Sequence, residues 1–242
     1  MKKKANAMEK EIAEEKMEED ADENEDIIND GSESVESDEQ EIDDGIEDKG
    51  NTMFSENREF QYELKVPKDR VAVLIGVKGA VKRQIEETTK NRLKIDSKEG
   101  DVVIKGKDAI GLYNAKEVIK AIARGFNPDV AQLLLKGDHV LEMISMRDYA
   151  ADSKKAMIRL KGRVIGAEGK SRKTIEFLTE SYICVYGKTI SIIGLPEKVA
   201  YARKAIESLL AGSPHSAVYR WLEKKRAEEK RAEFRMDNKF AE

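Results

Sequence analysis

The chain has 242 residues, of which 38% are charged, and a formal net charge of −4. This length suits one or two domains, and the longest apolar runs fall far short of the roughly 20 residues that a membrane-spanning helix requires. Cys184 is the only cysteine, which excludes a disulfide within the chain, and the N-terminal lysines are not followed by the apolar region of a secretion signal. We therefore expect a cytoplasmic protein that does not enter a membrane.

The charge is distributed unevenly along the chain. Residues 1–50 carry 21 acidic and 6 basic side chains, a net −15, which leaves 27 acidic and 38 basic side chains, a net +11, in the remainder. The acidic segment has few apolar side chains, so burial cannot offset the loss of chain entropy on folding. We predict a disordered acidic tail over residues 1–57, which either keeps the protein soluble or competes with RNA for basic domains or recruits a basic partner.

After the tail, the residue pattern predicts elements in the order β-α-α-β-β-α. Apolar alternation indicates strands, and apolar side chains three and four residues apart indicate helices. Asp69 is expected to cap the first helix, and Gly125 to end the last one. The expected elements are a strand at 59–67, helices at 71–75 and 81–89, strands at 92–96 and 101–106, and a helix at 108–123.

The second half repeats this order after a connecting helix that starts at Asn127 and Pro128. The expected elements are a strand at 139–146, helices at 153–165 and 171–180, strands at 182–187 and 188–194 with a tight turn at Gly187-Lys188, and a helix at 197–210. Ser213 and Pro214 then start a charged helix over 214–235. The predicted units are therefore 58–126, a connecting helix at 127–137, a second domain at 138–212 and a terminal extension at 213–242.

A glycine pair interrupts the helical pattern once in each half. IGVKG at 75–79 is followed by AVKRQIEETTK, and IGAEG at 165–169 is followed by KSRKTIEFLTE. Six identities separated by 90 positions indicate an internal repeat. The matching residues are Ile75, Gly76, Gly79, Ile85, Glu86 and Thr89 in the first copy, and Ile165, Gly166, Gly169, Ile175, Glu176 and Thr179 in the second.

The G-x-x-G corner is suited to holding a phosphate. Glycine has no Cβ, so a nucleic-acid backbone can approach closely. The start of the following helix has unpaired amide groups and a partial positive charge, which favour an anion. Side-chain cations follow each corner, namely Lys78, Lys82 and Arg83 in the first copy and Lys170, Arg172 and Lys173 in the second.

The pattern I-G-x-x-G-x5-I-E inside β-α-α-β-β-α resembles the type I KH domain, whose GXXG loop clamps about four nucleotides of a single strand. The resemblance implies an α+β fold of two tandem type I KH domains, each a three-stranded antiparallel sheet with helices on one face. The acidic tail and a C-terminal helix flank them. One GxxG is weak evidence, but two copies in register and in the same strand and helix context are strong.

The segments GRVIGAEGKSRKTIEFLT, YICVYGKTISIIG and GSPHSAVYRWLE together resemble archaeal members of the Dim two, or partner of Nob one, family of rRNA-processing factors. The similarity covers roughly residues 59–230. It implies binding of single-stranded rRNA near the 3′ end of the small subunit during ribosome assembly. It also implies, as partners, the endonuclease that trims that end and translation initiation factor two alpha. We expect a monomer without a cofactor.

The expected RNA-binding residues are the two loops, the isoleucines before them and nearby cations. They are Ile75, Gly76, Val77, Lys78, Gly79, Lys82, Arg83, Lys161, Arg163, Ile165, Gly166, Ala167, Glu168, Gly169, Lys170, Arg172, Lys173 and Lys188. Glu168 departs from the family pattern, because KH loops usually hold a basic residue there. The second domain is nevertheless expected to be the main RNA reader, since five cations surround its loop, and the first to be a secondary RNA site or a protein-docking surface.

No enzyme motif is present in the sequence. A P-loop, a metal-ligand cluster and a nucleophile–base pair are all missing, and the glycines do not fit the dinucleotide fingerprint G-x-G-x-x-G. His139 and His215 have no partner at zinc-ligand spacing, and His215 either contacts RNA or a partner, or has a local capping role. Two alternatives stay open, namely another KH protein of transcription or RNA turnover, and a protein-docking adaptor with little RNA affinity.

Overall fold

The structure, a computed structural model, describes residues 60–150 and 153–239, so the expected acidic tail lies outside the described residues. In the first domain, three strands and three helices follow one another in the expected order. The elements are β1 (Phe60–Lys65), α2 (Lys68–Ile75), the short η1 (Val77–Gly79), α3 (Ala80–Thr89), β2 (Arg92–Ile95), β3 (Asp101–Gly106) and α4 (Ala109–Ala123). The strands form an antiparallel sheet in the order β1-β3-β2.

The second domain repeats this arrangement after a short connection, α5 (Pro128–Ala131) and η2 (Gln132–Lys136). Its elements are β4 (Val140–Ser145), α6 (Arg147–Ala150), α7 (Lys154–Ile165), η3 (Ala167–Gly169), α8 (Lys170–Thr179), β5 (Tyr182–Tyr186), β6 (Thr189–Gly194) and α9 (Pro196–Leu210). The sheet order is β4-β6-β5, again antiparallel. The predicted α+β fold of two tandem β-α-α-β-β-α units is confirmed.

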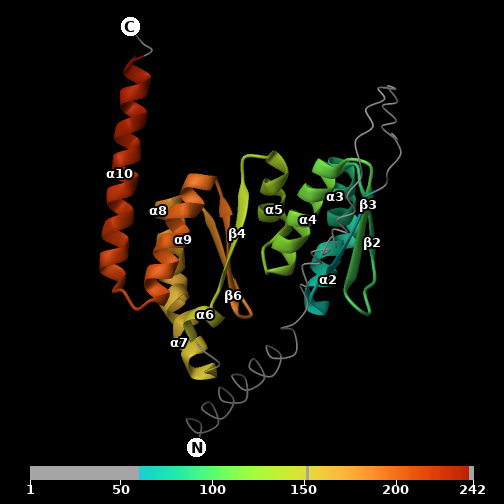
Figure 1. The fold of residues 1–242 in the computed structure, drawn as a ribbon, viewed down its shortest axis with the longest axis horizontal. Helices are drawn as coiled ribbons and strands as arrows, with labels where there is room; N and C mark the ends of the chain where they lie inside the picture. Colours follow the sequence, from blue (N-terminus) through green and yellow to red (C-terminus); the bar gives the residue numbers. More distant parts are fainter. Residues whose placement is uncertain (1–59, 151–152, 240–242) are drawn as a thin grey trace, which may run out of the picture.

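The last helix, α10 (His215–Lys239), runs along the outside of the second domain beside α8 and α9 (Figure 1). Val218 and Leu222 of its first turns are buried in the core of that domain. Trp221 lies edge-on to Tyr201 of α9, with 6.1 Å between the ring centroids. The first turns of α10 are therefore anchored by apolar packing through Val218, Trp221 and Leu222. None of the described helices is long and apolar enough to cross a membrane.

The two domains share a buried face. Strand β6 is buried on both sides, because Ile190 and Ile192 pack under the helices of the second domain while Ile193 packs into the core of the first. Leu141 and Cys184 join Ile193 against the first core. Figure 1 shows α4 of the first domain and the connecting helix α5 on one side of the sheet that contains β4 and β6, and α8 and α9 on the other. The second sheet is thus covered on both faces.

Polar contacts at the edge of this interface fix the domains further. The Tyr186 hydroxyl donates a 2.8 Å hydrogen bond to Oδ2 of Asp69 in α2, and Arg124 Nη1 donates to Thr189 Oγ1 at 3.3 Å. Burial, together with the neighbouring Asp69 carboxylate, raises the pKa of Tyr186 to about 12. The tyrosine is therefore a neutral donor at physiological pH.

One local prediction was wrong, and one short helix was not predicted. Asp69 does not cap α2, which begins one residue earlier at Lys68 with Pro67 in the N-cap position and no side-chain cap. The carboxylate of Asp69 instead accepts the hydrogen bond from Tyr186 of the other domain. The second difference is α6, which the apolar pattern did not predict, because a helix of four residues is too short to show a period.

Candidate nucleic-acid interface

The two GXXG corners have the same backbone geometry. Gly76 has φ 70° and ψ 177°, and Gly166 has φ 72° and ψ 173°. The second glycines, Gly79 and Gly169, have φ 76° and 75° and stand at the N-caps of α3 and α8. The amide of each second glycine donates to the carbonyl of the first at 3.2 Å, which closes the turn. The duplication seen in the sequence is therefore a duplication of one backbone structure.

The glycines are required for different reasons. A Cβ on Gly76 would lie 2.5 Å from Val81 Cγ2, and one on Gly166 would lie 2.7 Å from Ser171 Cβ, so these positions lack space as well as needing a positive φ. At Gly79 and Gly169 a Cβ would meet nothing within 4 Å, so only the positive φ favours glycine there. The open side of the second glycine leaves the corner accessible to a ligand backbone.

The corners leave amide donors for an anion. Neither α3 nor α8 has a side-chain cap, because glycine stands at both N-caps. The residues between the glycines are exposed, and Val77 retains 83% of its accessible surface. Lys78 and Glu168 each have φ 53°, a left-handed conformation that is uncommon outside glycine. The first amide of each helix, at Ala80 or Lys170, donates to the carbonyl of Val77 or Ala167. An exposed turn therefore precedes a helix N-terminus whose next amides have no side-chain acceptor.

The two corners differ in the sign of the charge between their glycines and in where their cations lie. The first loop carries Lys78 between its glycines, whereas the second carries Glu168 there. Lys170, which occupies the position of Ala80 in the first copy, places a cation two residues further along, and both Lys170 and Lys173 are exposed. In the second corner, one exposed carboxylate therefore precedes a helix start that carries cations.

The repeated glutamates serve the fold. Glu86 Oε1 accepts a 2.8 Å hydrogen bond from the Leu93 amide, and Glu176 Oε1 accepts one of the same length from the Ile183 amide. Each carboxylate thereby ties the helix after the loop to the exposed edge of the sheet. Lys82 lies 3.9 Å from Glu86, and Arg172 lies 3.7 Å from Glu176, so these two cations lie beside the helix–strand junction.

Of the remaining predicted site residues, Arg83 is exposed and the others are half-buried. Arg83 is exposed, and its Nη2 donates to the Lys78 carbonyl at 3.0 Å, which braces the first loop. Ile75 and Ile165 are half-buried at the ends of α2 and α7. Lys161, on the last turns of α7, and Lys188, in the turn between β5 and β6, are both half-buried.

Arg163 is turned to the fold rather than to the loop. Its Nε donates to the Leu209 carbonyl at 3.0 Å and its Nη2 to the Ser213 carbonyl at 2.7 Å. His215 Nε2 lies 2.8 Å from the Arg163 carbonyl oxygen, so the histidine joins α10 to the same place. We therefore leave Arg163 out of the RNA site, and His215 has the local role that the sequence left open.

Sequence reasoning missed a corresponding arginine in the first domain. Arg70 Nε donates to the Ile122 carbonyl at 2.9 Å, and its Nη2 to the Phe126 carbonyl at 2.7 Å. Arg70 and Arg163 are not separated by 90 positions, so the repeat carries no signal for this shared role. Among the described residues, no group of three or more His, Cys, Asp and Glu side chains is placed to hold a metal ion.

Comparison with known families agrees with this geometry. Residues 140–227 match a family model described as a eukaryotic type KH-domain (KH-domain type I), and residues 61–121 match a KH domain model. Both matches contain a GXXG corner in its strand–helix context.

Three known proteins illustrate the similarity. A KH domain-containing protein of Methanocaldococcus jannaschii is 48% identical over 177 residues, which cover 72% of this chain and 77% of the relative. A pre-rRNA-processing protein PNO1 of Candida albicans is 28% identical over 162 residues, which cover 65% of this chain and 59% of the relative. The structure of an a/eIF2alpha–aDim2p–rRNA complex from Pyrococcus horikoshii contains a chain with 41% identity and a TM-score of 0.66. The match covers 70% of this chain and 96% of that chain.

Proposed function

Because the chain belongs to the Dim2 and PNO1 family of KH-domain rRNA-processing factors, we propose that it is an RNA-binding ribosome assembly factor. Its two GXXG corners bind single-stranded small-subunit rRNA near the 3′ end, and this binding assists pre-rRNA processing. The observation that carries the proposal is the presence of two geometrically equal corners, each followed by a helix without a side-chain cap and by exposed cations.

The mechanism is positional rather than catalytic. The backbone of an unpaired strand approaches the open second glycine, and the amides that follow Ala80 in α3 or Lys170 in α8 donate to its phosphate oxygens. Lys78 and Arg83 supply charge at the first corner, and Lys170 and Lys173 at the second. Since phosphate contacts release counterions, the affinity falls as salt rises. Bound RNA is held extended at the protein surface, where a processing enzyme can reach it.

The second domain is proposed as the main RNA reader. Lys170, Arg172 and Lys173 lie on the first turn and a half of α8, where the helix N-terminus also attracts an anion. Translation initiation factor two alpha is a proposed partner, supported by its presence with rRNA in the Pyrococcus complex. Contact with the endonuclease that trims the 3′ end, the monomeric state, the cytoplasmic location and the domain boundaries stay predictions.

The test is the affinity for an RNA that copies the 3′ end of the cognate small-subunit rRNA. Replacing Lys170 and Lys173 with aspartate leaves the core untouched, because both side chains are exposed, and Asp suits a helix start. Fluorescence anisotropy at low salt is expected to show at least about a tenfold loss of affinity, since each charge-assisted contact contributes about 1.5–3 kcal/mol. Lys224→Asp with Lys230→Asp, both exposed on α10, is the matched control.

The result decides between the proposed function and an adaptor. If the loop variant and the control bind RNA with equal affinity, the second corner is not the RNA site. If the unmodified protein shows no RNA affinity at low salt yet binds translation initiation factor two alpha, the adaptor function replaces the proposed one.

A further inference from the structure

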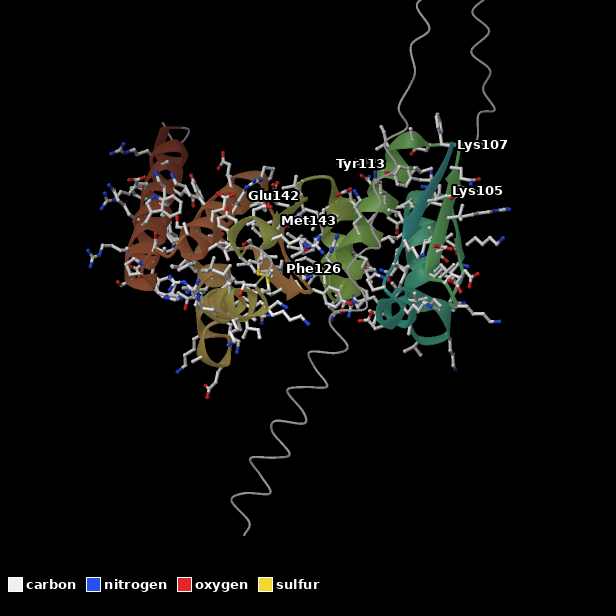
Figure 2. All side chains as sticks on the ribbon, turned by 60° about the horizontal axis from the view of Figure 1, so that its bottom comes forward. Lys105, Lys107, Tyr113, Phe126, Glu142 and Met143 are labelled. Carbon is white, nitrogen blue, oxygen red and sulfur yellow. The ribbon has the colours of Figure 1, made fainter. Side chains whose placement is uncertain are left out.

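An exposed apolar patch lies where the described part of the chain begins. Phe60, Ile110 and Tyr113 retain 44%, 72% and 60% of their accessible surface, and we call these three side chains the entry patch. Phe60 is the first residue of β1 and is paired with Gly106, the last residue of β3, shortly before α4 starts. Figure 2 shows Tyr113 at the same end of the first domain as Lys107, the residue that follows Gly106.

The contacts between β1 and α4 bring the entry patch together. Lys116 of α4 donates to the hydroxyl of Tyr62 in β1, and its Nζ lies 3.8 Å from the centroid of the Tyr62 ring. Tyr113 precedes Lys116 by one helical turn, and Ile110 precedes Tyr113 by another. Phe60 precedes Tyr62 by two residues, so both side chains are on the same face of the strand. Tyr113 therefore lies at the Phe60 end of β1.

The fold does not require large apolar side chains at these helix positions. α4 and α9 are both 15 residues long, and each follows the last strand of its domain. Counted from the helix starts, Ile110 corresponds to Glu197 and Tyr113 corresponds to Ala200, which are both exposed. The second domain thus forms the same helix without an apolar pair there. Single exposed apolar residues are ordinary, but adjacent ones indicate a surface that another segment covers.

The segment before β1 has the composition and the reach to cover the entry patch. Met53 and Phe54 are the nearest apolar residues before Phe60, and the residues between them and Phe60 are polar. Ser55 and Asn57 favour a turn in this stretch. The chain from Phe54 to Phe60 spans at most about 20 Å, at roughly 3.3 Å per residue. Because the segment is tethered beside the patch, a small apolar contact is enough to hold it there.

The charges favour the same occupant. Residues 39–48 carry six acidic side chains and lie directly before Met53 and Phe54 in the sequence. Lys105 and Lys107 are exposed at the end of β3 that is paired with the start of β1. The acidic run is therefore attracted to the end of the first domain that carries the entry patch.

We propose that residues 51–59 fold back over the entry patch, with Met53 and Phe54 packed against its three side chains. The contact anchors the acidic segment of the chain at this end of the first domain. It does not involve the GXXG corners, so it can be tested without RNA and separately from the proposed function.

Hydroxyl-radical footprinting of the full chain, read by mass spectrometry, measures the accessibility of each side chain. Tyr182 of β5 is 46% exposed and serves as the internal reference for Tyr113. In the unmodified protein we expect Tyr113 to be oxidised at least about threefold more slowly than Tyr182, because a covered ring loses most of its exposed surface. The docking variant, Met53→Ser with Phe54→Ser, should raise the oxidation of Tyr113 at least to that of Tyr182.

A reciprocal experiment removes part of the patch and measures Met53. Ile110→Ser is expected to raise the oxidation of Met53, because it takes away part of the apolar surface on which Met53 packs. Ile158→Ser makes the same change at an exposed isoleucine of α7 and should leave Met53 as it is in the unmodified protein.

Three results would overturn the inference. The first is equal oxidation of Tyr113 and Tyr182 in the unmodified protein. The second is protection of Tyr113 that persists in the docking variant, and sedimentation velocity would then show whether a second copy of the chain is the occupant. The third is an equal loss of protection in Ile42→Ser with Ile46→Ser, which makes the same kind of change further from β1.

Discussion

Arg70 and Arg163 donate the same pair of hydrogen bonds from different positions of the two domains. Each guanidinium binds two carbonyl groups four residues apart at the end of its domain's last helix, at Ile122 and Phe126 for Arg70 and at Leu209 and Ser213 for Arg163. The Ile122 and Leu209 carbonyls also accept the amides of Gly125 and Gly212, so each arginine adds a second hydrogen bond there and complements the helix dipole. Both arginines thus tie the helix before the GXXG corner to the far end of the domain.

Arg163→Ala is expected to lower the free energy of unfolding by about 2 kcal/mol, because hydrogen bonds from a charged donor contribute about 1.5–3 kcal/mol. RNA affinity of the folded protein should stay unchanged. Urea unfolding checks the stability, and Arg159→Ala, an exposed arginine of the same helix, is the matched control. A large loss of RNA affinity with unaltered stability would return Arg163 to the RNA site.

Gly76→Ala should destabilise the protein more than Gly79→Ala. Gly79 is in the left-handed region, which costs a side-chain residue roughly 1–2 kcal/mol, whereas Gly76, with φ 70° and ψ 177°, is in a region that essentially only glycine adopts. Only at Gly76 does the new methyl group also meet Val81, at 2.5 Å. Chemical denaturation of the two variants gives the comparison, and Gly166→Ala against Gly169→Ala repeats it in the second domain. Equal losses at both glycines would contradict the steric explanation.

Stability should fall above about pH 10 partly through Tyr186. Burial and Asp69 raise its pKa from 10.0 to about 12 in the folded state, so between these values the unfolded state loses its proton first. The contribution to stability is therefore complete below pH 10 and is lost as pH rises toward 12. Lysines titrate in the same range, so the measurement is the difference in unfolding free energy between the protein and Tyr186→Phe. If the difference in unfolding free energy between the two proteins increased with pH, the prediction would be contradicted.

Glu168→Lys should strengthen RNA binding, because it replaces the exposed carboxylate in the second GXXG corner with a cation. If the new lysine contacts one phosphate, the salt slope steepens by about 0.7. Glu223→Lys on α10 makes the same charge change at an exposed position away from the loop. Equal gains for both variants would show that net charge, rather than the corner, drives the effect.

Much of the fold was predictable from local pattern. Apolar residues spaced by 2 and by 3.6 positions located the strands and most helices, and the glycine repeat located both corners. Both signals depend only on residues that are close together in the sequence. The repeat also marked Glu86 and Glu176 as equivalent, although their bonds to Leu93 and Ile183 were visible only in the structure. The hydrogen bonds of Asp69 and Arg163 could not be predicted, because their partners lie 117 and about 50 residues away along the chain.

By itself the sequence determined two copies of one unit, each with a GxxG corner, since a GxxG turn before a cationic helix needs only adjacent residues. Tertiary structure alone decided which sheet face is covered and which stays open. Ile193, Cys184 and Leu141 are buried because another domain packs on them, whereas Arg92, Lys94 and Lys105 stay in solvent because none does. Burial depends on surfaces that come together from distant segments of the chain, so the local spacing of residues cannot predict it.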